Sequence, residues 1–366
     1  MKKLGIYIHI PFCLAKCKYC GFFSNKASEK EQDDYIDKLI EDMDEYGKTY
    51  GDRYTVDSVF IGGGTPSILN PEQVERVFES LKKNFVLEKD PEITIEANPK
   101  TLTKEKLTAY KKAGVNRLSI GLQSFDDSVL EILGRAHRAE DFLESYNLAR
   151  TCGFDNINVD LMFGVPGHSM KVWEDTLEKV VELGPEHISF YSLQIEEGTL
   201  FYDMFMSGEL EQIDEYTDRA MYHRAVGLLK EAGYCHYEIS NCSKNGFQCR
   251  HNLKYWSFDE YLGIGQAASS FIEGIRFTEA PYMDYHVNTL EDDMSEFTFT
   301  GLRKTCGLDM KEFSHRFGRE FWQVYGEQKN SLADFFRQGF LIEEGSILRL
   351  SEEGIDISNT IMAEFV

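Results

Sequence analysis

Three cysteines near the start of the chain have a spacing suited to a metal centre. They are Cys13, Cys17 and Cys20, so three thiols fall within eight residues. Thiolates on one short loop can converge on a single centre, but a structural zinc site takes four ligands and usually closes with a second, distant pair. A cubane iron–sulfur cluster takes one ligand per iron, so three cysteines leave one iron free to bind a small molecule. The spacing therefore favours a cluster with an open iron over three unrelated buried thiols.

The composition restricts the partners and the compartment. The 366 residues include 39 Lys and Arg against 62 Asp and Glu, for a formal charge of −23. A chain this acidic is repelled by phosphate backbones and by anionic lipid, which argues against nucleic-acid binding. No apolar run approaches the roughly 20 residues that span a bilayer, and no cleavable export signal precedes the first strand-like segment. We therefore expect a cytoplasmic protein with no transmembrane segment and with reduced thiols.

Short apolar segments alternate with amphipathic ones over the first part of the chain. Strands are expected from the start to Pro11 and at 56–61, 93–97, 115–120, 157–162 and 187–191. Helices are expected at 31–46, from 71, at 103–112, within 126–151, and at 169–182 and 214–232. Repeated strand–helix units build a parallel sheet with helices outside. Six such units in about 230 residues predict an α/β fold, namely a partial (β/α)6 barrel of the TIM-barrel type.

Polar or glycine-rich positions recur where the expected strands end. The three-cysteine loop follows the first strand, and Gly62-Gly63-Gly64-Thr65 follows the second. Glu96, Gln123 and Asp160 stand at or just after the ends of the third, fourth and fifth strands. Because chemistry in such barrels lies at the carboxyl ends of the strands, we expect all these positions on one rim.

The remainder of the chain is expected to form two further parts. Residues 235–295 are rich in Tyr, Asn and Ser and are expected to be irregular. Helices near 309–317 and 329–338, followed by strands at 341–342 and 348–350, predict a small α+β domain of winged-helix type. The expected division is a barrel at 1–232, a connecting region at 233–293 and a C-terminal domain at 294–366.

Several motifs along the chain resemble those of one superfamily. They are YIHIPFC at 7–13 with the two later cysteines, GGGTP at 62–66, IEANP at 95–99, GLQSF at 121–125, DLMFGVP at 160–166 and HNLKYW at 251–256. Together they resemble the radical S-adenosylmethionine (SAM) superfamily, in its coproporphyrinogen-III-oxidase-like branch. The HNxxYW segment resembles the haem chaperone subgroup of that branch, the HemW type. The resemblance covers nearly the whole chain and implies a radical SAM barrel as the fold.

The resemblance also implies a [4Fe–4S] cluster and SAM as cofactors. Cys13, Cys17 and Cys20 would hold the cluster, while the amine and carboxylate of SAM would chelate the open iron. The SAM contacts that the resemblance implies are Tyr7, Tyr19, Gly63, Gly64, Thr65, Glu96, Gln123, Arg135 and Asp160. Tyr19 would lie beside the adenine, the glycines and Thr65 at the methionyl end, and Arg135 at the carboxylate. Glu96, Gln123 and Asp160 would bond the ribose or the amine. Tyr7 is also well explained as a core tyrosine.

Two departures from the porphyrin-making enzymes of this branch favour another function. Those enzymes resemble Cys-x3-Cys-x2-Cys-x-Cys, and the last position is Phe22 here. Those enzymes also carry a sizeable extension before the first strand. In this sequence only four residues precede Gly5. We therefore expect a protein that binds haem and transfers it to acceptor proteins. The alternatives are an oxygen-independent coproporphyrinogen III oxidase, which makes protoporphyrinogen IX through a 5′-deoxyadenosyl radical, and a radical SAM enzyme with an unrelated substrate.

His251 is the expected axial ligand of the haem, because imidazole is the commonest protein donor to haem iron. Tyr255 and Trp256 would flank the macrocycle, and Cys249 is an alternative ligand. The expected partners are haem or another tetrapyrrole, haem-acceptor proteins, and an electron donor such as flavodoxin or ferredoxin. Homodimerisation, covalent attachment of haem and cleavage of SAM are questions that the sequence leaves open.

Overall fold

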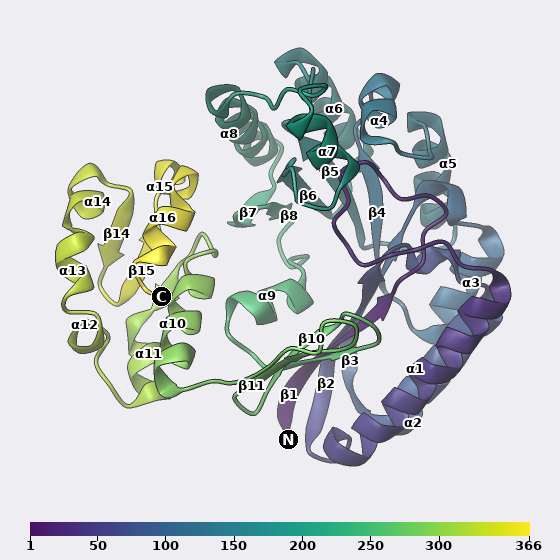
Figure 1. Cartoon of the computed structure of the whole chain (residues 1–366), viewed down its shortest axis with the longest axis horizontal. Helices are drawn as coiled ribbons and strands as arrows, with labels where there is room; N and C mark the ends of the chain where they lie inside the picture. The colour runs from purple at the N-terminus through teal and green to yellow at the C-terminus, as the bar shows by residue number, and fades with distance from the viewer.

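A computed structural model describes all 366 residues and has a twelve-stranded sheet at its centre (Figure 1). Its six central strands run parallel and in chain order: β1 (Lys2–Ile10), β2 (Tyr54–Gly63), β3 (Val86–Ala97), β4 (Arg117–Gln123), β5 (Ile157–Phe163) and β6 (His187–Ser192). The sheet continues past β1 on one side and past β6 on the other, and its two outermost strands do not pair with each other. The barrel is therefore open, and the predicted partial (β/α)6 fold is confirmed.

Helices cover the outer face of these strands (Figure 1). They are α1 (Glu29–Tyr50), α2 (Pro71–Asn84), α3 (Lys104–Ala113), α5 (Ala139–Thr151), α6 (Met170–Leu183) and α8 (Glu215–Glu231). Two further helices, α4 (Asp127–Leu133) and α7 (Leu200–Met206), lie beside the loop that follows β1, where Lys18 bonds to Leu133 and Phe201. Two short 3-10 turns, η1 (Pro66–Ile68) and η2 (Pro99–Thr101), follow β2 and β3. All seven residues of β4 are buried, as expected for a parallel strand covered on both faces. On α1 the buried side chains are Ile36, Leu39 and Met43, whose spacing of three and four residues places them on one face of the helix.

The segment after α8 is more regular than predicted. It contains β7 (Cys235–Glu238), β8 (Asn241–Ser243), α9 (Arg250–Trp256), β9 (Tyr261–Ile264), β10 (Ser269–Ile272), β11 (Ile275–Thr278) and β12 (Tyr285–Val287). These strands extend the central sheet, with β9 parallel to β1 and β8 antiparallel to β6. The expectation of an irregular region at 235–295 is wrong, because strands of three or four residues are too short to show a periodicity. β9 and β8 pair with the barrel strands, and the other short strands pair with neighbours in the same segment.

The last part of the chain forms a small mixed domain beside the barrel (Figure 1). Its helices are α10 (Leu290–Gly301), α11 (Met310–Phe317), α12 (Phe321–Val324), α13 (Gln328–Ser331), α14 (Ala333–Gln338), α15 (Glu352–Asp356) and α16 (Ser358–Ala363). Its antiparallel strands are β13 (Leu308–Asp309), β14 (Leu341–Glu344) and β15 (Ile347–Leu350), in the order β13-β15-β14. A helical part followed by a β-hairpin matches the predicted winged-helix type. Nowhere does the chain form a helix long and apolar enough to cross a membrane.

The small domain is not separate from the barrel in its packing. One continuous hydrophobic core of 70 buried residues runs from the barrel strands to the C-terminus. At the surface, His223 on α8 lies 2.8 Å from Asp356, and Lys230 on the same helix pairs with Glu352. The three-part division of the chain stays a prediction, and the strands of its middle part belong to the sheet of the barrel.

Candidate cofactor site

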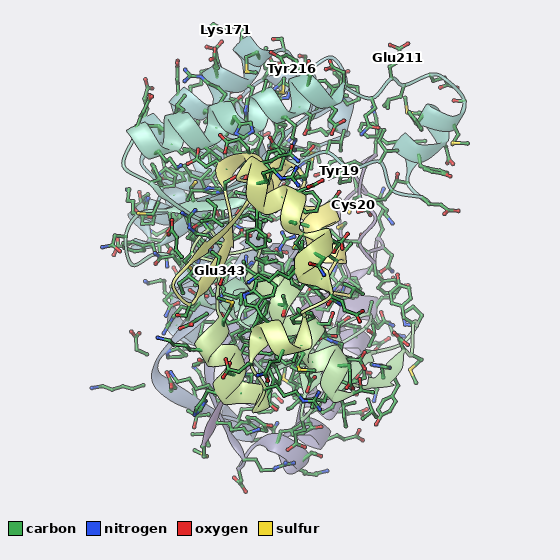
Figure 2. The ribbon with its side chains drawn as sticks, turned by 90° about the vertical axis from the view of Figure 1, so that its left-hand side faces the viewer. Tyr19, Cys20, Lys171, Glu211, Tyr216 and Glu343 are labelled. Carbon is green, nitrogen blue, oxygen red and sulfur yellow. The ribbon has the colours of Figure 1, made fainter.

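The three-cysteine loop leaves the carboxyl end of β1 and is fixed at its base and along its side. The Cys13 N–H donates to the Asn25 carbonyl at 2.9 Å, and the Asn25 N–H donates to the Pro11 carbonyl at 2.8 Å. Farther along the loop, the Lys18 N–H donates to the Leu133 carbonyl at 3.1 Å. Figure 2 labels Tyr19 and Cys20 on this loop, and Glu211 on the segment that projects between α7 and α8. The loop is therefore closed at its base by its own backbone and fixed along its side to the end of α4.

The three thiols face one region and are not oxidised to disulfides. The Cys13 sulfur lies 3.6 Å from Thr65 Oγ1, and Arg135 Nη1 lies 3.5 Å from the Cys17 sulfur. Burial raises the pKa of Cys20, and the neighbouring Cys17 and Cys13 thiols raise it further. No three His, Cys, Asp or Glu side chains of the chain meet around a single metal ion. Three thiols on one loop are the ligand set that a cubane cluster with one open iron takes.

The glycine run after β2 passes very close to this loop. The Gly64 N–H donates to the Ile10 carbonyl at 2.8 Å, and the Thr65 N–H donates to the Phe12 carbonyl at 2.7 Å. A Cβ on Gly64 would lie 2.6 Å from the Phe12 carbonyl oxygen, which is closer than real contacts allow. Gly63 has a φ of 110°, which favours glycine. The turn therefore exposes bare backbone beside Cys13.

Two carboxyl groups, Glu96 near the end of β3 and Asp160 in the middle of β5, face the interior of the barrel. The Gly63 N–H donates to Glu96 Oε2 at 3.1 Å. Asp160 accepts hydrogen bonds from Ser119 and Asn158, each at 2.8 Å. Burial, and after it the charge of Asp160, raise the pKa of Glu96 from 4.5 to about 8. Burial also raises the pKa of Asp160, against the hydrogen bonds from Ser119 and Asn158 that lower it.

Arg135 and Gln123 complete the rim near Cys17. Arg135 Nη2 donates to the Gly121 carbonyl at 3.1 Å, while its Nε is buried and has no partner. Gln123 has a φ of 70°, a left-handed conformation that few side chains adopt. A Cβ on Gly121 would come within 3.1 Å of Gln123 Nε2. The unpaired N–H of Arg135 fits an anionic group of a ligand.

Two aromatic side chains flank the same region. Burial raises the pKa of Tyr19, and the nearby Arg135 opposes the rise. The Tyr7 hydroxyl lies 3.0 Å from His9 Nδ1, and His9 Nε2 lies 3.0 Å from the Phe23 carbonyl. His9 was not among the predicted site residues. Its place two residues after Tyr7, on the same face of β1, is the signal that could have found it.

Comparison with known proteins covers the whole chain. Residues 7–180 match the model of the radical SAM superfamily, and residues 288–357 match that of the HemN C-terminal domain. The chain is 35% identical to "Heme chaperone HemW" of Bacillus subtilis over 98% of both chains. It is 33% identical to the mitochondrial radical S-adenosyl methionine domain-containing protein 1 of Mus musculus, over 98% of this chain and 86% of that one.

The chain belongs to the HemW family. A protein of the same name from Escherichia coli is 40% identical over 72% of this chain and 69% of its own length. The solved structure of coproporphyrinogen III oxidase (HemN) from Escherichia coli, described as a radical SAM enzyme, covers 100% of this chain and 90% of its own with a TM-score of 0.87. At 22% identity that likeness shows the fold alone.

Membership of the HemW family, and so of the radical SAM superfamily, implies a [4Fe–4S] cluster and SAM. The residues present fit both groups. The three cysteines are free thiols, and Cys13 and Cys17 lie near enough to Cys20 to raise its pKa, which suits a shared cluster. Arg135 keeps a buried N–H without a partner, which can bond an anionic group of SAM.

The histidine of the HNxxYW motif lies inside the barrel, contrary to its expected place at a haem iron. His251 Nδ1 is 3.0 Å from Ser58 Oγ, and Nε2 is 2.9 Å from the Tyr255 hydroxyl. Its backbone N–H donates to Glu92 at 3.0 Å, and its ring stacks on Phe60. The side chain is 1% exposed, and burial lowers its pKa to about 3. Both ring nitrogens are therefore engaged, and this placement does not present His251 to a haem.

The alternative haem ligand is equally enclosed. Cys249 is fully buried, and its thiol donates to Glu92 at 3.5 Å. Helix α9 follows directly and carries His251 and Tyr255 on one face, since they are four residues apart. The motif thus anchors α9 against β1, β2 and β3 through its first half.

The second half of the motif reaches a cavity of about 680 Å³. It lies between the end of the cysteine loop, β9 to β11 and helix α10. Its lining consists of Tyr7, His9, Gly21, Phe22, Phe23, Tyr255, Trp256, Tyr261, Ala267, Ser269, Arg276, Tyr282, Glu296, Phe299 and Thr300. Small-molecule sites have volumes of about 300–1,000 Å³. Phe22, Phe23, Tyr261, Tyr282 and Phe299 were not predicted, because they come from segments without a recognisable pattern.

Proposed function

We propose that this protein binds haem and delivers it to acceptor proteins. The observation that carries the proposal is the aromatic cavity beside the cysteine loop, to which the HNxxYW motif contributes Tyr255 and Trp256. A flat, largely apolar macrocycle packs well against aromatic faces. Relatives that match over nearly the full chain are named haem chaperones, which supports the same function.

We propose that Cys13, Cys17 and Cys20 bind the [4Fe–4S] cluster and that the surrounding rim binds SAM. When bound, this pair of cofactors supplies one-electron chemistry. The backbone of Gly63 and Gly64 and the Thr65 hydroxyl lie at the methionyl end, because they adjoin Cys13.

The remaining rim residues have complementary tasks toward SAM. Arg135 takes the carboxylate with its unpaired N–H. Glu96 and Asp160 bond the ribose hydroxyls or the amine, and Gln123 bonds the ribose. Tyr19 packs beside the adenine. Tyr7 on β1 bonds SAM through its hydroxyl, which the contact with His9 orients.

A haem in the cavity needs an axial ligand from the chain. For His251 to serve, its bond to Tyr255 has to break, and Tyr255 already lines the cavity. We therefore propose that haem binding through His251 requires a rearrangement of α9. Replacing Cys249 in parallel tests the alternative ligand.

The partners and the compartment belong to the same proposal. Reduction of the cluster requires a one-electron donor, and we propose a flavodoxin or ferredoxin. We propose a cytoplasmic location, since the thiols are unpaired and the chain is strongly acidic. Haem-acceptor proteins are the expected recipients.

Titration with haem under anaerobic conditions tests the function. We expect a Soret band of bound haem with one haem per chain, weakened in His251→Ala and retained in Cys249→Ala. Transfer to an apo-haem protein should follow when that acceptor is added. Absence of a bound Soret band, together with protoporphyrinogen formation from coproporphyrinogen, would replace the proposal with the oxidase function.

The cluster assignment has its own prediction. Cys17→Ala should lose the cluster, because a cubane with two protein ligands is held too weakly to survive desalting. Iron and sulfide analysis of the reconstituted protein measures this. Cys152→Ala is the matched control, since Cys152 is half-buried away from the loop and should leave the iron content unchanged. Equal iron content in both variants would contradict the assignment.

A further inference from the structure

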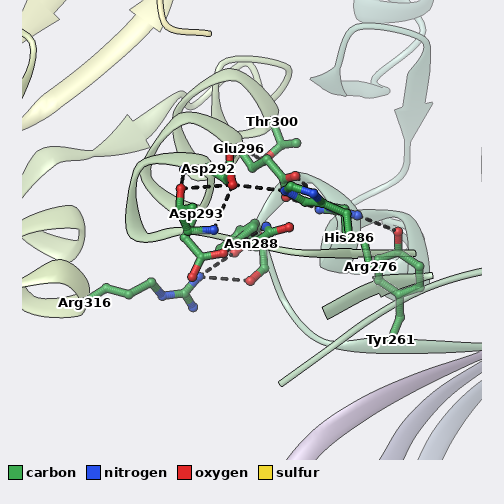
Figure 3. A network of polar contacts seen from close by, with 12 residues as sticks. Tyr261, Arg276, His286, Asn288, Asp292, Asp293, Glu296, Thr300 and Arg316 are labelled. Atoms are coloured by element: carbon green, nitrogen blue, oxygen red, sulfur yellow. Dashed lines mark hydrogen bonds and ion pairs between the residues drawn. The ribbon is translucent and has the colours of Figure 1, made fainter. Parts of the chain in front are cut away.

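The charge of the cavity wall is as informative as its aromatic character. Among its lining residues Arg276 is the one lysine or arginine, and Glu296 is the one acid. Arg276 comes from β11 and Glu296 from α10, so the pair joins the barrel sheet to the small domain. Figure 3 shows the two side chains together with Tyr261. The wall therefore offers a single cation that already has a partner.

The position of Arg276 is well determined by its contacts. Its Nε donates to both Glu296 oxygens, at 2.6 and 2.8 Å, and Nη2 also donates to Glu296. Nη1 lies 3.2 Å from the Tyr261 hydroxyl, and the guanidinium stands 4.5 Å from the centre of the Phe271 ring. A guanidinium has five N–H donors, so two remain for a ligand. The planar guanidinium binds a carboxylate through two parallel hydrogen bonds, which no other side chain can offer.

Resting on the proposed function, we propose that Arg276 binds a propionate of the haem and that Glu296 limits how many carboxylates the cavity accepts. Haem has two propionates. One would bind Arg276, and the other would extend into solvent at the open side of the cavity. Iron coproporphyrin brings four, and the additional carboxylates would face aromatic rings or Glu296. A charge buried without a partner is strongly unfavourable. The wall thus selects haem over its more acidic precursors.

The test compares three porphyrins on the wild-type chain and on its variants. The porphyrins are haem, haem dimethyl ester, which lacks both carboxylates, and iron coproporphyrin III. Wild-type protein should bind haem more tightly than iron coproporphyrin. Arg276→Gln should weaken haem binding about tenfold and leave the affinity for the ester unchanged. Arg276→Lys should weaken haem binding less than Arg276→Gln does. Glu296→Gln should strengthen binding of iron coproporphyrin most.

Arg53→Gln is the matched control. Arg53 pairs with Glu273 at the turn between β10 and β11, outside the cavity. This variant loses a surface ion pair of the same hairpin and should bind all three porphyrins as the wild type does. If Arg276→Gln fails to fold, the comparison of haem with its ester on the wild-type chain still tests the carboxylate contact.

The outcomes separate the two proposals. If neither haem nor its ester binds to the wild type, the proposed function is wrong and this inference falls with it. If both bind equally well and Arg276→Gln changes neither, the function stands and the role of Arg276 is wrong. Equal affinity of haem and iron coproporphyrin on the wild type would overturn the role of Glu296.

Discussion

At the scale of residues, the site depends on a few side chains held where solvent cannot reach them. Glu96 is the clearest case, because burial and the neighbouring Asp160 together raise its pKa to about 8. Its oxygen accepts from the Gly63 backbone, so the carboxyl also shapes the glycine turn. Arg276 in the cavity wall differs, because its side chain is 32% exposed, Glu296 balances its charge and two of its N–H donors stay free.

The raised pKa of Glu96 predicts how the stability of the protein depends on pH. A carboxyl whose pKa is raised from 4.5 to about 8 in the folded state keeps a proton that the unfolded chain has released. Its contribution to stability is complete below pH 4.5 and is lost as the pH rises through about 8. Glu96→Gln keeps the neutral shape, so the unfolding midpoint should fall less between those pH values than in the wild type. Thermal unfolding across this range measures the difference.

The control for this variant is a carboxyl in solvent. Glu209→Gln alters an exposed side chain and should leave the pH profile as it is. Parallel pH profiles for wild type and Glu96→Gln would show that Glu96 is ionised in the folded protein, contrary to the expectation.

At the scale of elements, the site is made by loops that need specific residues to approach each other. The cysteine loop and the glycine turn share hydrogen bonds from Gly64 and Thr65 to β1 and Phe12. Helix α9 is held by its first residues, with Glu92 accepting from the backbone of Arg250 and His251. These contacts place Tyr255 and Trp256 at the cavity. The first residues of the motif therefore anchor α9, and its last two residues line the cavity.

Gly64→Ala tests the close approach. The new Cβ would meet the Phe12 backbone at 2.6 to 2.9 Å, and backbone cannot move aside as a side chain can. We expect a loss of about 1–3 kcal/mol in the free energy of unfolding, together with lower iron content after reconstitution. Denaturant unfolding and iron analysis measure the two effects.

Gly227→Ala provides the opposite case. Gly227 lies within α8, and a Cβ there meets nothing within 4 Å. Alanine in a helix interior stabilises by about 0.5–1 kcal/mol relative to glycine, so this variant should gain stability and keep its iron. A stable, cluster-loaded Gly64→Ala would show that the turn has room to shift.

At the scale of the whole molecule, the barrel and the small domain share one hydrophobic core. The ion pairs between α8 and α15 are partly exposed, and each adds little to stability. Burial of apolar surface is therefore what joins the two parts. The cavity lies at the same junction, with walls from the cysteine loop, the sheet extension and α10.

We expect the two parts to unfold together. Because the core is continuous, calorimetry should show one transition, and Phe321→Ala in the small domain should lower the midpoint of that whole transition. Met206→Ala, at a side chain that is 66% exposed, should leave it unchanged. Two separate transitions, with only one moved by Phe321→Ala, would show that the core is divided.

The sequence by itself determined the parts of this protein that depend on local order along the chain. The alternation of apolar and amphipathic segments predicted the open barrel, because each strand–helix unit buries its own apolar face. The spacing of the three cysteines and the strand-end positions of Glu96, Gln123 and Asp160 predicted a shared rim, because parallel strands bring their carboxyl ends together. Short strands of the sheet extension escaped prediction, since three or four residues carry no period.

Only the tertiary structure decided what each polar group faces. His251 looked available as a ligand, yet packing between β1, β2 and α9 occupies both of its nitrogens. The cavity and its single cation draw on segments more than 250 residues apart, from the cysteine loop to α10. Contacts between such distant segments depend on how the whole core packs, and no local pattern of residue types encodes them.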